Sequence, residues 1–135
     1  MQYQAQKLEA AKLNTYRWKK ELNNEIPQLH LALVNNWRYD EAYLLLEPNV
    51  WITSLDQIRL KWYHAESQER GEIKFEGGNK TSHARFAGQV YMKLLADAKF
   101  EIYLNKKWVP ILTESESRTA FETTVYDFYR LTERL

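Results

Sequence analysis

Three runs of residues between Pro48 and Lys99 decide the fold of this chain: Val50-Trp51-Ile52-Thr53-Ser54-Leu55, Ile58-Arg59-Leu60-Lys61-Trp62-Tyr63 and Glu72-Ile73-Lys74-Phe75-Glu76. Apolar and polar side chains alternate in the second and third runs, and a period of two residues predicts strands of an antiparallel sheet. The turn Gly77-Gly78-Asn79 then leads to a helical pattern from Thr81 to about Ala98. The order strand, strand, strand, helix predicts a small module of sheet and helix.

The second run separates two faces. One face carries Ile58, Leu60 and Trp62, and the other carries Arg59, Lys61 and Tyr63. We expect Trp62 in the core, beneath the apolar stripe of the following helix. That stripe consists of Phe86, Val90 and Leu94. Tyr63 lies on the opposite, wet face, where it is expected to be exposed.

Further strands are predicted after the helix. Residues 99–104 and 108–112 have strand patterns, and Asn105-Lys106-Lys107 forms a turn between them. Residues 113–118 are predicted to be a polar loop. Residues 121–129 are rich in Thr, Val, Tyr and Phe, and this composition favours a final strand.

The N-terminal third shows helical spacing instead of alternation. Between residues 4 and 25 a narrow apolar stripe recurs every three or four positions, which is typical of a coiled-coil seam. Its candidate interaction residues are Leu8, Ala11, Trp18 and Leu22. Pro27 suits the first turn of a second helix over residues 28–47, which Pro48-Asn49 would end.

Together these patterns predict an α+β fold. Two N-terminal helices would be followed by an antiparallel sheet with one long helix packed across it. Residues 1–47 are expected to form the helical, coiled-coil-like segment, and residues 48–135 the sheet-containing domain.

Composition and charge restrict the classes of function. The chain has 135 residues, of which 44% are hydrophobic and 27% charged, as in an ordinary soluble domain. Lys and Arg number 19 against 18 Asp and Glu, which argues against an electrostatic footprint for nucleic acid or an anionic membrane. The absence of cysteine excludes disulfides, thiol nucleophiles and Cys-ligated metals. No apolar run approaches the roughly 20 residues that span a bilayer.

No motif predicts catalysis, a cofactor or a metal. His30, His64 and His83 lack a short ligand spacing, so isolated histidines are expected and a metal site assembled by folding is the alternative. Gly77-Gly78-Asn79-Lys80-Thr81-Ser82 lacks the glycine spacing of a phosphate-binding loop. These glycines are expected only to supply positive φ angles between a strand and its helix.

The aromatic strand Lys61-Trp62-Tyr63-His64 leaves one alternative open. Interleaved with Arg59 and Lys61, it can form a stacking platform for single-stranded nucleic acid. The near-zero net charge weighs against that function. We therefore expect no nucleic-acid partner, and we expect Arg59, Lys61 and Tyr63 to contact another protein.

From Glu47 onward the chain resembles the periplasmic domain of the PilN-like proteins of type IV pilus assembly, and of the related GspL-type proteins of type II secretion. Three segments carry the resemblance: Pro48-Asn49-Val50-Trp51-Ile52-Thr53-Ser54-Leu55, Gly71-Glu72-Ile73-Lys74-Phe75-Glu76-Gly77 before a helix near Ser82, and Ala96-Asp97-Ala98-Lys99-Phe100. The resemblance covers about two thirds of the chain. It implies a ferredoxin-like domain behind a coiled-coil helix, with no catalytic residues.

The resemblance also implies a function. The chain would be a non-enzymatic structural or adaptor subunit of a bacterial envelope machine, at the periplasmic face of the inner membrane. We expect a homodimer or a related assembly subunit as partner, no small-molecule substrate, and membrane association only through an anchor absent from this chain. The alternative is a cone-shaped NTF2-like domain that serves as a secretion or conjugation subunit or a small-molecule enzyme. A pocket lined by Trp62, Tyr63 and Trp108 would favour the enzyme.

Overall fold

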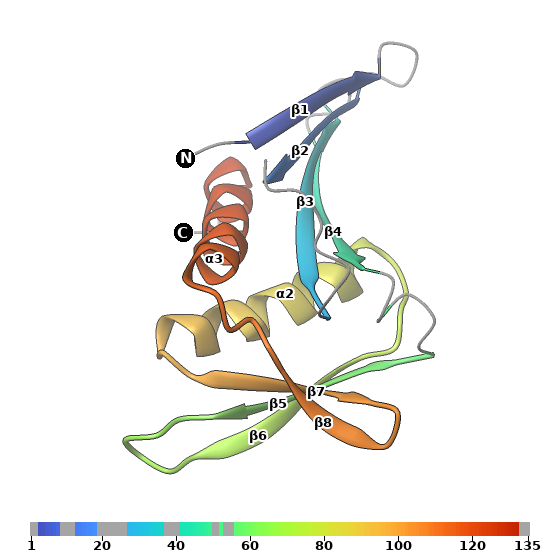
Figure 1. Ribbon diagram of the computed structural model, residues 1–135. Coiled ribbons are helices and arrows are strands. Elements are labelled where there is room, and N and C mark those ends of the chain that lie inside the picture. Colours follow the sequence, from blue (N-terminus) through green and yellow to red (C-terminus); the bar gives the residue numbers. More distant parts are fainter. Residues whose placement is uncertain are drawn as a thin grey trace.

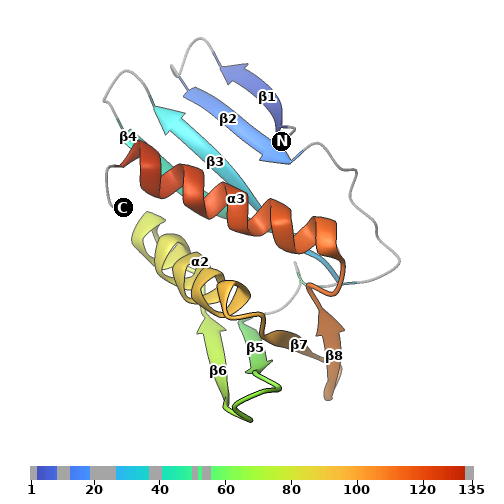
Figure 2. The ribbon, with the colours of Figure 1, turned by 90° about the vertical axis from the view of Figure 1, so that its left-hand side faces the viewer.

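The computed structural model describes residues 3–8, 13–18, 27–36, 41–49, 52 and 56–132. Within these ranges the chain forms two four-stranded antiparallel sheets and two long helices (Figure 1). Helix α2 (Lys80–Leu95) lies between the two sheets, and α3 (Ser115–Leu131) lies beside α2 against the first sheet (Figure 2).

Each sheet is built from four strands that follow one another in the chain, with α2 inserted between the second and third strands of the second sheet. The first sheet has the order β1-β2-β3-β4, with β1 at Tyr3–Leu8, β2 at Leu13–Trp18, β3 at Leu29–Asn36 and β4 at Glu41–Pro48. The second sheet has the order β6-β5-β7-β8, with β5 at Ile58–Tyr63, β6 at Arg70–Phe75, β7 at Lys99–Leu104 and β8 at Lys107–Ile111. Two hairpins, β5–β6 and β7–β8, therefore meet at the central pair β5 and β7.

The two N-terminal helices expected from the sequence are wrong, because the described residues of this region form strands. β3 pairs with β4 along its whole length. The expected helix rests on apolar residues such as Leu29 and Leu33, but residues four apart share a face in a strand as well as in a helix. Leu31, Ala32 and Val34 are buried as well, so both faces of β3 are covered and its burial does not distinguish the period of a strand from that of a helix.

The expected coiled-coil seam is wrong for the same reason. Leu8 lies in β1 opposite Leu13, and Trp18 lies in β2 opposite Tyr3. Ala11 and Leu22 lie outside the described residues. Dimerisation through a first helix therefore has no basis in this fold.

The expected final strand is also wrong, because residues 121–129 belong to helix α3. The predicted polar loop at residues 113–118 includes the first turn of that helix. The buried residues of α3 follow a helical period, and they are Ala120, Phe121, Thr124, Val125, Asp127 and Phe128. Their β-branched and aromatic side chains favour strands in isolation, but packing overrides this propensity. The hydroxyl of Thr124 donates to the carbonyl of Ala120 at 2.8 Å, so this buried polar group is satisfied.

The ferredoxin-like fold is therefore wrong as a whole. The described chain has no two leading helices, and α3 stands where the closing strand was expected. The alternative, a cone-shaped NTF2-like domain, also begins with helices, whereas the described N-terminal residues of this chain form strands. Of the expected strand at residues 50–55 only Ile52 is described, and it is buried with a helical backbone.

The middle of the chain follows the predicted pattern. Strands β5, β6, β7 and β8 and helix α2 are confirmed within a few residues, and the predicted stripe Phe86, Val90 and Leu94 is buried. Trp62 packs against the core but remains partly exposed. It lies over Gly71, where an added Cβ would stand 2.7 Å from the indole nitrogen, so the facing strand needs glycine there.

His83 fixes α2 against both sheets. Its Nδ1 accepts a hydrogen bond of 3.0 Å from the backbone nitrogen of Leu46 in β4, the last strand of its sheet. Its ring meets that of Phe75 in β6 edge-on, with the centroids 4.9 Å apart. Burial lowers the pKa of His83. Only the neutral imidazole can accept the bond from Leu46, so burial and hydrogen bonding both favour the same protonation state.

The lowered pKa of His83 predicts acid sensitivity. Below its unfolded pKa of about 6.5 the unfolded chain binds a proton that the folded chain resists, so stability should fall as pH falls from about 8 to about 5. Replacing His83 by Gln should cost about 0.5–1.5 kcal/mol at about pH 8, the usual net value of one hydrogen bond. The variant should lose less further stability on acidification than the wild type. Urea unfolding of both proteins measures this, and equal pH slopes would contradict it.

Candidate functional site

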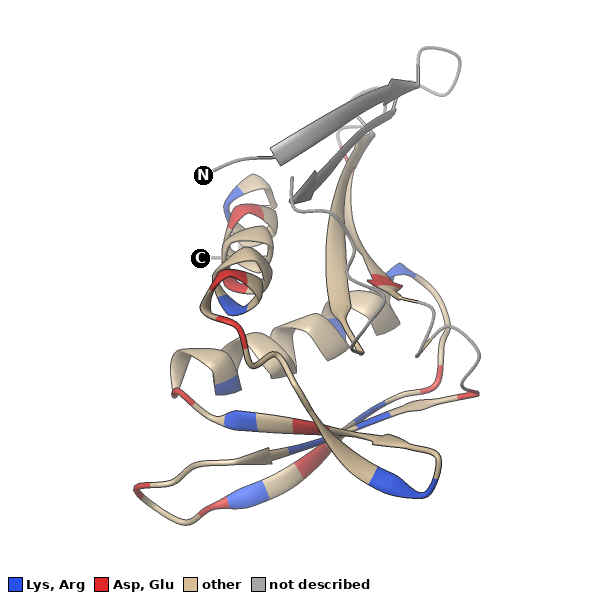
Figure 3. Cartoon of the chain, viewed as in Figure 1, with Lys and Arg blue, Asp and Glu red and all other residues tan. Residues whose placement is uncertain are grey.

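The second sheet has one face covered by α2 and one face open. The side chains that point away from α2 alternate with buried ones along each strand. We call this surface the outer face, and it consists of Arg59, Lys61, Tyr63, Arg70, Glu72, Lys74, Lys99, Glu101, Tyr103, Trp108 and Pro110. Figure 3 shows charges of both signs on these strands. More cations than carboxylates lie on this face.

Aromatic rings hold two of these cations in place. The guanidinium carbon of Arg59 lies 4.9 Å from the ring centroid of Tyr103 and 5.3 Å from that of Trp108. The Nζ of Lys61 lies 4.4 Å from the Trp108 centroid. The two rings are themselves 5.1 Å apart. Contacts of this kind restrict long cationic side chains that would otherwise be mobile.

Glu72 orients Arg59 from the other side. Its carboxylate accepts hydrogen bonds of 2.9 and 3.4 Å from Arg59, and Lys74 lies 3.5 Å from it. The hydrogen bond from Arg59 is the main reason that the pKa of Glu72 is lowered. Arg59 therefore contacts a carboxylate and two aromatic rings. Within the described residues, the only charged or aromatic group that the ammonium group of Lys61 contacts is the ring of Trp108.

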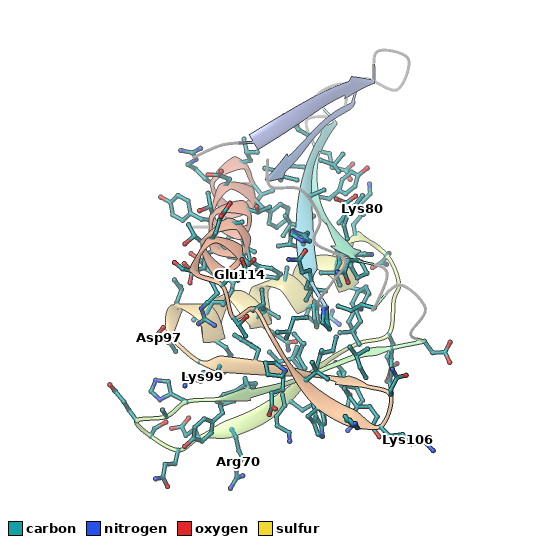
Figure 4. All side chains as sticks on the ribbon, viewed as in Figure 1. Arg70, Lys80, Asp97, Lys99, Lys106 and Glu114 are labelled. Atoms are coloured by element: carbon teal, nitrogen blue, oxygen red, sulfur yellow. The ribbon has the colours of Figure 1, made fainter. Side chains whose placement is uncertain are left out.

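A groove lies at one end of the outer face, where the sheet meets the start of α3. Its volume is about 640 Å³. Cationic side chains on its walls are Lys61, Lys99 and Arg118, and apolar ones are Ala98, Phe100, Pro110, Ile111 and Leu112. Figure 4 shows Asp97 and Lys99 at this end of the sheet and Lys106 at the opposite end.

Arg118 is built into the wall of the groove. Its Nη1 donates to the carbonyl of Leu112 at 3.1 Å, and its Nη2 donates to the carbonyl of Ala98 at 2.8 Å. The carboxylate of Asp97 is 3.9 Å from Nη2, and the Asp97 side chain is 99% exposed. Arg118 thus joins the first turns of α3 to the ends of α2 and β8 and keeps its charge at the groove.

Two residues beside Arg118 have unusual backbone conformations. Leu112 has a φ of 55° and Asp97 a φ of 64°. For a bulky residue such as leucine, positive φ is an outlier, and such strain clusters at functional sites. Asp97 follows the last turn of α2, where its nitrogen donates to Leu94 and that of Ala98 donates to Lys93, which is a Schellman motif.

The structure brings together only part of the predicted interaction surface. Arg59, Lys61 and Tyr63 share the outer face, and Tyr63 is 40% exposed. Leu8 and Trp18 lie in the other sheet. Sequence reasoning missed Lys99, Glu101 and Tyr103, although alternation in residues 99–104 carried that signal, and it considered Trp108 only for a small-molecule pocket. It missed Arg118 because the polar composition of residues 113–118 predicts a loop, whereas α3 begins at Ser115.

The histidines and the glycine turn are not among the residues that line the groove. His30 contacts Gln28, and His64 contacts Ser67. Within the described residues no three His, Cys, Asp or Glu side chains are grouped to hold a metal. Gly77 and Gly78 both have positive φ, as predicted. The helix cap is Asn79, whose side chain accepts a bond of 3.2 Å from the nitrogen of Ser82.

Comparison with known proteins gives no relative. The chain matches no protein-family model, no curated protein and no solved structure. Among the described residues, no helix is both long enough and apolar enough to span a bilayer.

The Schellman motif gives a prediction about the rim of the groove. We expect Asp97→Gly to raise the free energy of unfolding by about 0.5–1 kcal/mol, because glycine adopts positive φ without the steric cost of a Cβ. Asp97→Asn is the matched control, since asparagine tolerates this conformation but also lacks the charge. Chemical denaturation measures both variants. A glycine variant no more stable than the asparagine variant would show that backbone strain is not what Asp97 contributes.

Proposed function

We propose that this chain is a non-enzymatic binding module that recognises another polypeptide through the outer face and the groove. One observation carries this proposal: a sheet that is covered on one side presents, on the other, cations held in contact with aromatic rings and a carboxylate. Arginine and the aromatic residues Tyr and Trp are enriched at protein interfaces. A surface whose side chains are already ordered loses less entropy when a partner binds.

The nucleic-acid alternative has less support. A base stacks on the free face of an aromatic ring. Arg59 and Lys61 lie over the rings of Tyr103 and Trp108, so a base would have to displace them. Glu72 and Glu101 lie on the same face and would repel phosphates.

A small-molecule function is the second candidate, and the size of the groove favours it. Ligand pockets measure about 300–1,000 Å³, and the groove falls in this range at about 640 Å³. The expected pocket of Trp62, Tyr63 and Trp108 does not form, because Trp62 lies on the opposite face of the sheet from the other two. We rank a polypeptide first, because the groove opens onto a wider surface of ordered side chains.

The place of this module in a cell remains a proposal. The sequence resemblance to pilus and secretion proteins supports an adaptor of an envelope machine at the periplasmic face of the inner membrane. We do not propose a coiled-coil dimer, because Leu8 and Trp18, which were expected in its helical seam, lie in strands. A partner is now expected at the outer face, which involves Arg59, Lys61 and Tyr63.

Site-specific photo-crosslinking in the native host tests this function. A photoreactive phenylalanine at Tyr63 should give a crosslink to a protein. The same residue at Tyr126, which is 44% exposed on α3, is the control and should give none. Crosslinks from Tyr126 alone would move the interface to the helices, and crosslinks from neither position would overturn the proposal.

A further inference from the structure

The charges around the groove are unbalanced. Lys61 and Lys99 line it and form no ion pair within the described part of the chain. The carboxylates at the groove are Asp97, whose side chain extends into solvent, and Glu101. Nearby, Glu72 is already engaged by Arg59. A negative group from outside would therefore meet cations without a partner.

Arg118 adds a cation whose position is fixed. Each of its two terminal nitrogens donates to one backbone carbonyl, at 3.1 and 2.8 Å. A guanidinium has five N–H donors in a planar arrangement, so donors remain for a second acceptor. The side chain is 19% exposed, which leaves it accessible from the groove. A carboxylate is the acceptor whose geometry and charge fit best.

The remaining walls of the groove are apolar. Ile111 and Leu112 line it and are buried, and Pro110, which also lines it, is exposed. Tyr63 stands at its edge. An apolar side chain can be covered between these groups, while a neighbouring carboxylate reaches the lysines.

We infer that the groove binds an acidic segment of the partner polypeptide, with one bulky apolar side chain inside the groove and flanking carboxylates against Lys61, Lys99 and Arg118. This inference rests on the proposed function and specifies the chemistry of the partner. Charge complementarity and the apolar walls together favour this occupant. A phosphate backbone would meet the same lysines but would leave the apolar walls without a contact.

A random peptide library selected on the 135-residue chain tests the inference without choosing a ligand in advance. Peptides of about 12 residues are long enough to cross the groove in an extended form. We expect the selected sequences to be enriched in Asp and Glu around a Leu, Ile, Phe or Trp. Peptides that bind at the outer face but lack acidic residues would overturn this inference and leave the proposed function standing. No selected peptide at the outer face would count against both.

Charge reversal identifies the groove as the site. The affinity of a selected peptide, measured by fluorescence anisotropy, should fall by about tenfold or more in Lys61→Glu and in Lys99→Glu. Lys106→Glu is the matched control, because it makes the same change of charge in an exposed turn at the other end of the sheet, and its effect should be less than about twofold. Equal losses in all three variants would show general attraction and would contradict a specific site. Thermal melts establish that each variant is folded.

Binding of an oligothymidylate of about 12 nucleotides tests whether the groove recognises single-stranded nucleic acid instead of an acidic peptide. We expect it to bind the wild-type chain more weakly than the selected peptide at the same salt concentration. Tighter binding of the oligonucleotide, lost in Lys99→Glu, would assign the groove to single-stranded nucleic acid and overturn the inference.

Discussion

The described fold depends on the burial of one helix between two sheets. Phe86, Ala87 and Val90 of α2 are each at most 2% exposed, and the helix contacts β4 on one side and β6 on the other. Full burial of a side chain such as Phe86 or Val90 contributes roughly 1.5–3 kcal/mol. The hydrogen bond between His83 and Leu46 is directional, whereas apolar contacts are not, so this bond sets the position of α2 along β4. Without α2 the second sheet would lose the helix that covers its inner face, and the first sheet would be covered by α3 alone.

This arrangement also determines which surface is free. Since α2 occupies the inner face of the second sheet, the opposite face remains for side chains that serve another purpose. The cations there are held by rings, by Glu72 and, for Arg118, by backbone carbonyls. Binding groups on a rigid scaffold need little rearrangement when a partner arrives. The strained Leu112 lies at the same place, which is consistent with a surface shaped for binding.

The sequence predicts the middle of this fold well and both ends poorly, for physical reasons. In the strands between Ile58 and Leu104 one face of the sheet is apolar and the other faces water, so the two-residue period of the sequence is unambiguous. In β3 both faces are apolar, and Leu29 and Leu33 fit a helix and a strand equally. In α3, Thr124 and Val125 have strand propensity, and only packing against the first sheet and α2 makes them helical. Of the candidate site, residues on β5 were predictable, whereas Arg118 depends on how distant segments meet.

The central position of α2 has a consequence for biosynthesis. The ribosome completes β3 and β4 before it has made α2 and α3, which cover their buried leucines. During that interval Leu31, Leu44 and Leu46 would face water on a nascent sheet, and exposed strands of this kind associate with other chains. The delay between synthesis of β4 and of α3 is therefore the period in which a nascent chain of this protein most needs a chaperone.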